Sequence, residues 1–101
     1  MFPQLKDPSL LETRAVVNGD WSDTPAHFQV LNPASGTVIA EVADATAGML
    51  TKAIDAADTA RVAWASLTGK ERSEILNRWY EIIRDNAGDL ARILTAEMGK
   101  P

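Results

Sequence analysis

The chain has 101 residues, with 10 Lys and Arg against 14 Asp and Glu, a net charge of −4, one His and no Cys. This length allows one small domain or part of a larger one. Without cysteine there is no disulfide framework, no thiolate nucleophile and no sulfur-ligated metal, and His27 alone supplies too few imidazoles for a zinc site. Ala makes up 16 of the hydrophobic residues, which predicts a folded protein with a lean core.

The distribution of charge and apolar residues excludes two classes of partner. Residues 1–45 are acidic and residues 46–101 are balanced, so neither part has the basic stripe that nucleic-acid binding needs. No apolar run approaches the roughly 20 residues that span a bilayer, and residues 1–14 lack a basic start followed by an apolar stretch. We therefore expect a cytoplasmic protein that binds neither nucleic acid nor membrane.

Residues 1–13 predict a loose arm. They contain Pro3 and Pro8, and their apolar residues follow no clean period. The one local signal is a helical turn expected around residues 9–13.

Residues 14–43 predict two β-hairpins. In the first, Asn18-Gly19 follows a short β-prone run and suits the positive φ angles of a type I′ turn. In the second, residues 32–36 form the loop, because Pro33 cannot donate to a strand ladder and Gly36 can take a positive φ. Isolated hairpins are marginal in water, so we expect a helix layer or a partner sheet to cover them.

Residues 46–99 change to a helical period and predict three helices. The first runs from about residue 47 to 65 with Thr46 as its N-cap. Its predicted buried face has apolar residues spaced three and four apart: Leu50, Ala53, Ile54, Ala57 and Trp64.

The second helix opens with Thr68-Gly69-Lys70-Glu71, a capping box in which the Thr hydroxyl and the Glu carboxylate each satisfy a free backbone N–H. Asn86 is expected to end this helix and to cap the third, which stops at Gly99. The inward stripes are predicted to be Ile75, Leu76, Trp79, Ile82 and Ile83 on the second helix and Leu90, Ile93 and Leu94 on the third.

No residue makes a convincing active site from the sequence alone. The six glycines match neither a dinucleotide-binding nor a phosphate-binding spacing and are better explained as turns, caps and breakers. His27 is the one conceivable triad base, but its place at a strand edge favours an ordinary exposed histidine. Trp64 and Trp79 fit core packing better than a stacking platform, and Trp21 is the tryptophan expected to be partly exposed.

Glu97 is the most informative acid. It lies on the inward face of the third helix and in its last turn, where the helix dipole disfavours negative charge. It could act as a positioned general base. The favoured interpretation is structural: an ion pair or cap with Arg72, with Lys100, or with a part of the protein outside these residues.

Several stretches in unbroken order resemble the start of NAD(P)-dependent aldehyde dehydrogenases, most closely the succinate-semialdehyde dehydrogenase branch. They are residues 17–21, 30–42, 53–57 and Trp64, followed by residues 67–72, Leu76, Trp79, residues 89–91, Thr95, Glu97 and residues 99–101. The resemblance covers the chain from about residue 12 onward. One departure is Val62, where many relatives carry Pro.

The resemblance implies an enzyme about five times longer, in which a cysteine thiolate attacks the aldehyde and a hydride passes to NADP or NAD. The family's catalytic and cofactor-binding residues lie downstream, so no catalytic, cofactor-binding or metal site residue is carried over. Certain relatives bind a monovalent cation through carbonyls equivalent to Val30 and Leu31, but the other ligands would be missing.

We therefore expect an α+β segment, two β-hairpins followed by three α-helices, that forms an incomplete part of an α/β cofactor-binding domain. It would act as an inactive scaffold whose partner is the remainder of the same polypeptide. The resemblance implies that the full-length enzyme is a homo-oligomer that oxidises succinate semialdehyde or a similar small aldehyde. The alternative is a self-sufficient, non-enzymatic interaction module.

Overall fold

The structure is a computed structural model that describes residues 4–101. It contains the two hairpins and three helices expected from the sequence, preceded by a short 3-10 turn. The elements are η1 (Pro8–Leu10), β1 (Ala15–Val17), β2 (Asp20–Ser22), β3 (His27–Leu31), β4 (Val38–Ala43), α1 (Ala47–Ser66), α2 (Gly69–Asp85) and α3 (Ala87–Met98).

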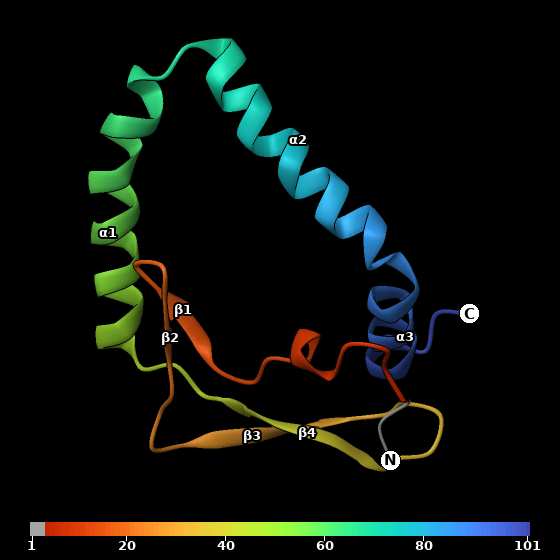
Figure 1. Cartoon of the computed structure of the whole chain (residues 1–101). Helices are drawn as coiled ribbons and strands as arrows, with labels where there is room; N and C mark the ends of the chain where they lie inside the picture. Colours follow the sequence, from red (N-terminus) through yellow and green to blue (C-terminus); the bar gives the residue numbers. More distant parts are fainter. Residues whose placement is uncertain (1–3) are drawn as a thin grey trace.

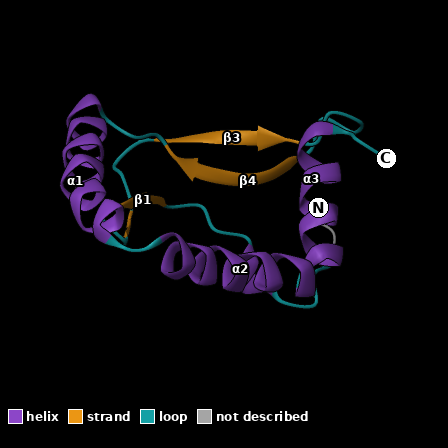
Figure 2. Ribbon diagram, turned by 90° about the horizontal axis from the view of Figure 1, so that it is seen from above, coloured by secondary structure: helices purple, strands orange, loops and turns teal. Residues whose placement is uncertain are grey.

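The elements form a triangular frame with no central core. Helices α1 and α2 make two sides, hairpin β3–β4 runs along the third, and α3 lies at the corner where α2 meets the hairpin loop (Figures 1 and 2). The frame measures 48 × 34 × 20 Å. Its radius of gyration is 16.6 Å, against about 13 Å for a compact domain of this length.

Hairpin β1–β2 is built around the predicted turn. Asn18 and Gly19 both have positive φ, 53° and 78°, as a type I′ turn requires, and Val17 pairs with Asp20 across it. The hairpin is tied to the rest of the chain where the Ala43 amide donates to the Thr13 carbonyl at 2.8 Å.

Hairpin β3–β4 closes through an ordered loop. The Asn32 side chain accepts from the Ala34 amide at 2.9 Å, and the Gly36 amide donates to the Asn32 carbonyl at 2.8 Å. The register shifts next to this loop, between Val30 and Leu31. A shift of this kind bends the strand and sharpens its twist, which directs the loop toward α3 (Figure 1).

The helix caps predicted from the sequence are confirmed. The Thr46 hydroxyl accepts from the Met49 amide, and both hydrogen bonds of the capping box between Thr68 and Glu71 are present. Helix α3 ends at Gly99, whose φ of 74° is the left-handed conformation typical of a C-terminal cap.

Asn86 occupies the N-cap position of α3 as predicted, but its side chain does not cap that helix. Asn86 does end α2, but its side-chain amide donates back to the Ile82 carbonyl at 2.8 Å, and it makes no side-chain cap for α3. The side chain is already used by the preceding helix. The predicted arm also differs: its helical turn is a 3-10 turn at Pro8–Leu10, and Leu5 is buried, so the described part of the arm is not loose.

The lean core expected within the chain is absent among residues 4–101, apart from two buried apolar side chains, Leu5 and Ala96. Trp64 and Trp79, expected inside, are 39% and 61% exposed. Trp21 is exposed as predicted, at 53%, but it is not the only exposed tryptophan of the described chain. The other large apolar side chains of α1 to α3 that are exposed are Leu50, Ile54, Val62, Ile75, Leu76, Tyr80, Ile82, Ile83, Leu94 and Met98.

The face of α1 that packs within the chain is rotated from the predicted one. Met49, Ala53 and Ala56 are half-buried beside β1, whereas Leu50 and Ile54 are about 60% exposed. The predicted face is therefore wrong for most of its residues, because residues 4–101 provide nothing that covers it. Helix α2 likewise has no buried residue.

The consequence is a large surface for so short a chain. The accessible area is 7684 Å², against roughly 5,600 Å² expected for a folded monomer of this mass. The excess is more than twice the roughly 800 Å² that each partner contributes to a standard protein interface.

We predict that the isolated chain binds an apolar dye such as anilinonaphthalene sulfonate and enhances its fluorescence, because the exposed apolar faces provide binding sites. The comparison is a compact monomeric domain of similar length at equal concentration. A monomer with a sharp thermal transition and no dye signal would contradict the open frame and favour the interaction module.

Candidate functional site

The one buried charged side chain among the described residues is the carboxylate of Asp89, in the first turn of α3. It is 5% exposed and accepts hydrogen bonds from the backbone amides of Lys6, at 3.0 Å, and Asp7, at 2.9 Å. Arg92, one turn further along α3, donates to the same carboxylate at 3.0 Å. The bonds from the Lys6 and Asp7 amides join residues more than 80 positions apart and fix the arm to α3.

The environment keeps Asp89 ionised. The Lys6 amide and then the Asp7 amide lower the pKa of this carboxyl, and Arg92 adds to the effect, while burial opposes it. Its place near the helix N-terminus also favours negative charge. The role is therefore positional: the carboxylate satisfies amides of the arm that would otherwise lack partners.

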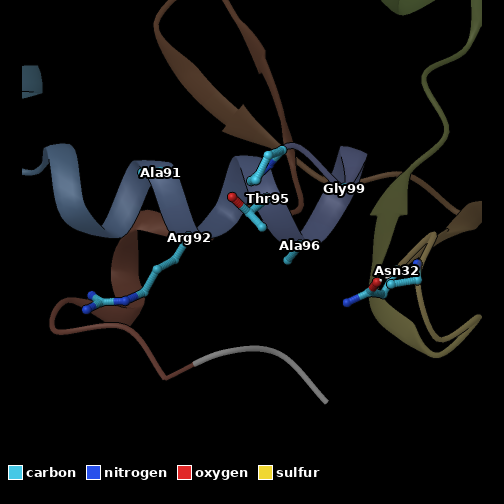
Figure 3. A pocket seen from close by; sticks show the side chains of 8 residues that line it. Asn32, Ala91, Arg92, Thr95, Ala96 and Gly99 are labelled. Atoms are coloured by element: carbon cyan, nitrogen blue, oxygen red, sulfur yellow. Dashed lines mark hydrogen bonds between the residues drawn. The ribbon is translucent and has the colours of Figure 1, made fainter.

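A groove of about 590 Å³ lies between α3 and the loop of hairpin β3–β4 (Figure 3). We call it the α3 groove. Its lining consists mostly of small residues with few polar side chains: Asn32, Ala34, Ala91, Arg92, Thr95, Ala96, Gly99 and Pro101.

At one end of the α3 groove, Gly99 lies close to Pro33 of the hairpin loop. A Cβ atom on Gly99 would lie 3.2 Å from the Cγ atom of Pro33, a tight contact that would require the Pro33 ring to shift by a few tenths of an ångström. The positive φ of Gly99 also favours glycine at this position. Helix α3 and the loop are therefore seated directly against each other beside the groove.

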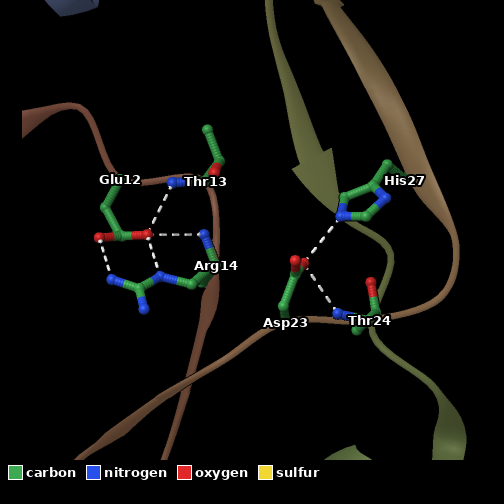
Figure 4. A network of polar contacts seen from close by, with 6 residues as sticks. All are labelled: Glu12, Thr13, Arg14, Asp23, Thr24 and His27. Carbon is green, nitrogen blue, oxygen red and sulfur yellow. Dashed lines mark hydrogen bonds and ion pairs between the residues drawn. The ribbon is translucent and has the colours of Figure 1, made fainter.

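A second polar cluster lies at the start of β1 (Figure 4). Arg14 donates to Glu12 through Nε at 2.8 Å and Nη2 at 3.1 Å. These bonds, followed by the Arg14 amide, lower the pKa of Glu12 to about 2. The guanidinium of Arg14 also lies 5.7 Å from the ring centre of Trp21, so this exposed tryptophan packs against a cation of its own hairpin.

His27, the one conceivable catalytic base, belongs to a local structural pair. Its Nε2 atom lies 2.7 Å from Asp23, which also accepts from the Thr24 amide at 2.8 Å (Figure 4). The Thr24 amide, followed by His27, lowers the pKa of Asp23. No serine among the described residues hydrogen-bonds to His27, so the structure brings no triad together here.

Glu97 lies away from the partners proposed for it. Its side chain is exposed, and within residues 4–101 it forms no ion pair with Arg72 or Lys100. Arg72 instead donates to the Leu67 carbonyl at 2.8 Å. The predicted ion pair is therefore wrong for the described chain.

Asp89 is the residue that sequence reasoning missed. Its signal was an acid in the first turn of a helix, which is typical of many exposed residues and does not reveal a partner in the arm.

The junction between β4 and α1 lacks the features of a dinucleotide-binding turn. Strand β4 leads into α1 through residues 44–46, which contain no glycine, and the Thr46 hydroxyl already accepts from an amide of the first turn. A pyrophosphate needs a glycine-rich turn and free amides at this position. Within residues 4–101 no group of three His, Asp or Glu residues is placed to hold a metal ion, and no helix is long and apolar enough to cross a membrane.

Comparison with known proteins gives one consistent answer. The model of the aldehyde dehydrogenase family matches residues 21–101. The chain is 46% identical over 100 residues to a glutarate-semialdehyde dehydrogenase of Pseudomonas putida, a match that covers 97% of this chain and 21% of the relative. The chain belongs to the aldehyde dehydrogenase family. The resemblance inferred from the sequence is thus confirmed.

Solved structures of aldehyde dehydrogenases place the frame within a larger fold. An NADP-dependent enzyme of Escherichia coli superposes with a TM-score of 0.93 at 40% identity, over 97% of this chain and 21% of that one. The succinate-semialdehyde dehydrogenase of Burkholderia pseudomallei gives 0.88 at 40% identity, over 93% and 20%. The chain spans about a fifth of the length of the aldehyde dehydrogenases that it matches, and the fold expected from the sequence is confirmed as an incomplete domain.

We predict that Asp89→Asn frees the arm from α3, because the neutral amide is a weaker acceptor for the Lys6 and Asp7 amides and no longer pairs with Arg92. Hydrogen exchange at these two amides should speed up by about tenfold or more. Glu97→Gln is the matched control, an acid-to-amide change on an exposed residue of the same helix. Unchanged exchange in Asp89→Asn would contradict the anchoring role.

The same contact predicts a pH dependence. A carboxyl whose pKa is lowered by folding stabilises the folded form above its unfolded pKa, about 3.9, and loses that contribution as the pH falls through the lowered value. The arm should therefore stay attached at neutral pH and detach progressively as the pH falls from about 4 through the lowered pKa of Asp89. The NMR shifts of the Lys6 and Asp7 amides would follow this transition, which should disappear in Asp89→Asn.

Proposed function

We propose that the chain is the N-terminal scaffold portion of an NAD(P)-dependent oxidoreductase that oxidises succinate semialdehyde or a similar small aldehyde to the carboxylate. The observation that carries the proposal is the match of nearly the whole chain to about a fifth of each semialdehyde dehydrogenase. In this proposal NADP or NAD and the aldehyde bind to the rest of the polypeptide, the intact enzyme is a cytoplasmic homo-oligomer, and residues 1–101 alone are inactive.

The chemistry of the chain supports a scaffold role. Its sequence contains no thiol, so it cannot form the thiohemiacetal from which the family's hydride transfer starts. Its sole imidazole, on His27, is paired with Asp23. Charged groups that are well held, such as Asp89, bind backbone amides of the chain itself.

The surface of the chain supports the same role. The apolar side chains of α1 and α2 are spaced as in buried helices, yet residues 4–101 leave them exposed. Helices with such stripes are stable when a neighbouring layer covers them. In the proposal, that layer is the rest of the cofactor-binding domain.

A chimera tests the proposal. Residues 1–101 replace the matched fifth of the Pseudomonas putida glutarate-semialdehyde dehydrogenase. We expect the chimera to oxidise that enzyme's aldehyde with reduction of the coenzyme, at a rate within about tenfold of the parent, because the chain's frame superposes on its family with its helix faces in place. Residues 1–101 alone should reduce no coenzyme.

The matched control is the same downstream polypeptide without residues 1–101, which should be inactive because its sheet lacks a covering layer. Aldehyde-dependent coenzyme reduction by the isolated chain would contradict the proposal, and so would a soluble, folded chimera without activity. The chimera tests the role of the chain and leaves open which aldehyde its own enzyme uses, since the substrate pocket comes from the downstream part.

A further inference from the structure

The turn of hairpin β1–β2 exposes an asparagine and the backbone amide that follows it. Asn18 and Gly19 are both exposed, and a Cβ atom built on Gly19 would meet nothing within 4 Å. Among residues 4–101, neither the Asn18 side chain nor the Gly19 amide has a hydrogen-bond partner, because the ladder of this hairpin ends at the pair of Val17 and Asp20. Both groups are therefore free to react with each other.

The other three asparagines of the sequence differ in this respect. Asn32 precedes Pro33, whose ring nitrogen carries no N–H. Asn77 lies inside α2, where a helical hydrogen bond holds the amide that follows it. The Asn86 side chain donates to the Ile82 carbonyl at 2.8 Å. In the part of the chain that the structure describes, the turn of β1–β2 alone leaves both an asparagine side chain and the next amide unengaged.

The short hairpin permits the movement that a reaction between these groups needs. The positive φ angles of Asn18 and Gly19, 53° and 78°, belong to the closed turn, and the backbone has to rotate out of this geometry to bring the Gly19 nitrogen onto the Asn18 side chain. Strands β1 and β2 have three residues each, and a two-stranded hairpin of this size is marginally stable. The turn therefore opens without unfolding the rest of the chain.

We propose that Asn18 is a site of spontaneous deamidation in the folded chain. The Gly19 nitrogen attacks the side-chain carbonyl carbon of Asn18 and forms a C–N bond, while the side-chain nitrogen leaves as ammonia with the proton of the Gly19 amide. Water then opens the resulting cyclic imide at either carbonyl, which gives aspartate or isoaspartate. No atom is oxidised or reduced, and water is the one co-reactant. Glycine favours ring closure because it has no side chain beside the attacking nitrogen.

The two products affect the hairpin differently. Aspartate keeps the turn, since Asp tolerates the left-handed conformation as Asn does. Isoaspartate carries the main chain through the former side chain and adds one methylene to a two-residue turn, so it breaks the pairing of Val17 with Asp20. Ala15 and Val17 are half-buried in β1, which packs beside α1. The isoaspartate form should therefore loosen this strand from the helix.

Incubation of the 101-residue chain in mildly alkaline buffer tests the proposal. Trypsin releases Asn18 and Asn32 together in residues 15–52, so Asn32 is an internal control in the same peptide. We expect mass spectrometry to find both aspartate and isoaspartate at residue 18, formed about tenfold or more faster than any product at Asn32, because Pro33 lacks the attacking N–H. An isoaspartate-specific methyltransferase should label the incubated chain.

Two variants serve as matched controls. Asn18→Gly removes the reacting carboxamide and keeps the turn, since glycine takes a positive φ, and it should abolish the methyltransferase label. Asn18→Asp carries the charge of the product without the additional methylene. Hydrogen exchange at the amides of β1 and β2 should be faster in the isoaspartate form than in Asn18→Asp by about tenfold or more, because only the isoaspartate form loses the strand pairing.

The same chain unfolded in urea sets the reference rate. We expect the folded chain to deamidate at residue 18 within about tenfold of this rate, because opening the short hairpin costs little. A folded chain that keeps Asn18 while the unfolded chain converts it would overturn the inference. Aspartate without isoaspartate would exclude the cyclic imide, and a label that persists in Asn18→Gly would place the reaction elsewhere. Either result also overturns the inference, and neither affects the scaffold role, which the chimera tests separately.

Discussion

Most of the apolar side chains of α1 and α2 are not covered by any other part of residues 4–101. The open shape of the structure follows from this missing cover. Helix α2 has a well-defined apolar stripe and α1 a weaker one, and such helices gain most of their stability from packing rather than from propensity. The chain therefore has the secondary structure of a domain without the interior of one. Leu5 and Ala96, the two buried apolar residues of the part that the structure describes, both belong to the corner formed by the arm and α3.

That corner is where the chain holds itself together. Asp89 joins the arm to α3 through charged hydrogen bonds, and the close approach of Gly99 to Pro33 seats the hairpin loop on the other end of the same helix. Both contacts join residues far apart in the sequence, and neither depends on a large apolar area. Helix α3 thus acts as the fixed point to which the arm and hairpin β3–β4 are attached, while α1 and α2 extend away from it (Figure 1).

The sequence predicted the local structure well because local structure is set by neighbouring residues. The turn at Asn18-Gly19, the capping box from Thr68 to Glu71 and the helix end at Gly99 each depend on residues within one turn of each other. Asn86 shows the limit of this reasoning: its amide can bond backward to α2 or forward to α3, and the sequence does not decide between them.

Burial was predicted less well, for a physical reason. A helical period shows that a stripe needs cover, but it does not show whether the cover lies in the same 101 residues. Trp64 and Trp79 have the spacing of core residues and yet are exposed here, because nothing in the described chain reaches them. For the candidate site, Asp89 was missed since its partners are backbone amides, which carry no residue signature. The α3 groove was missed because its small lining residues resemble ordinary helix alanines.

The likeness to solved structures connects the exposed helix faces with the open shape of the frame. The frame superposes on a fifth of an NADP-dependent enzyme with a TM-score of 0.93, so the separation of its sides is that found inside a larger protein. A chain free to minimise its own exposed apolar area would instead bring α1 and α2 together. The spacing between the helices thus matches that found within the longer chain of the solved structure. In this arrangement local caps define the helices and Asp89 and Gly99 define the corner, and in the proposed scaffold role the uncovered stripes are the surfaces that the rest of the polypeptide covers.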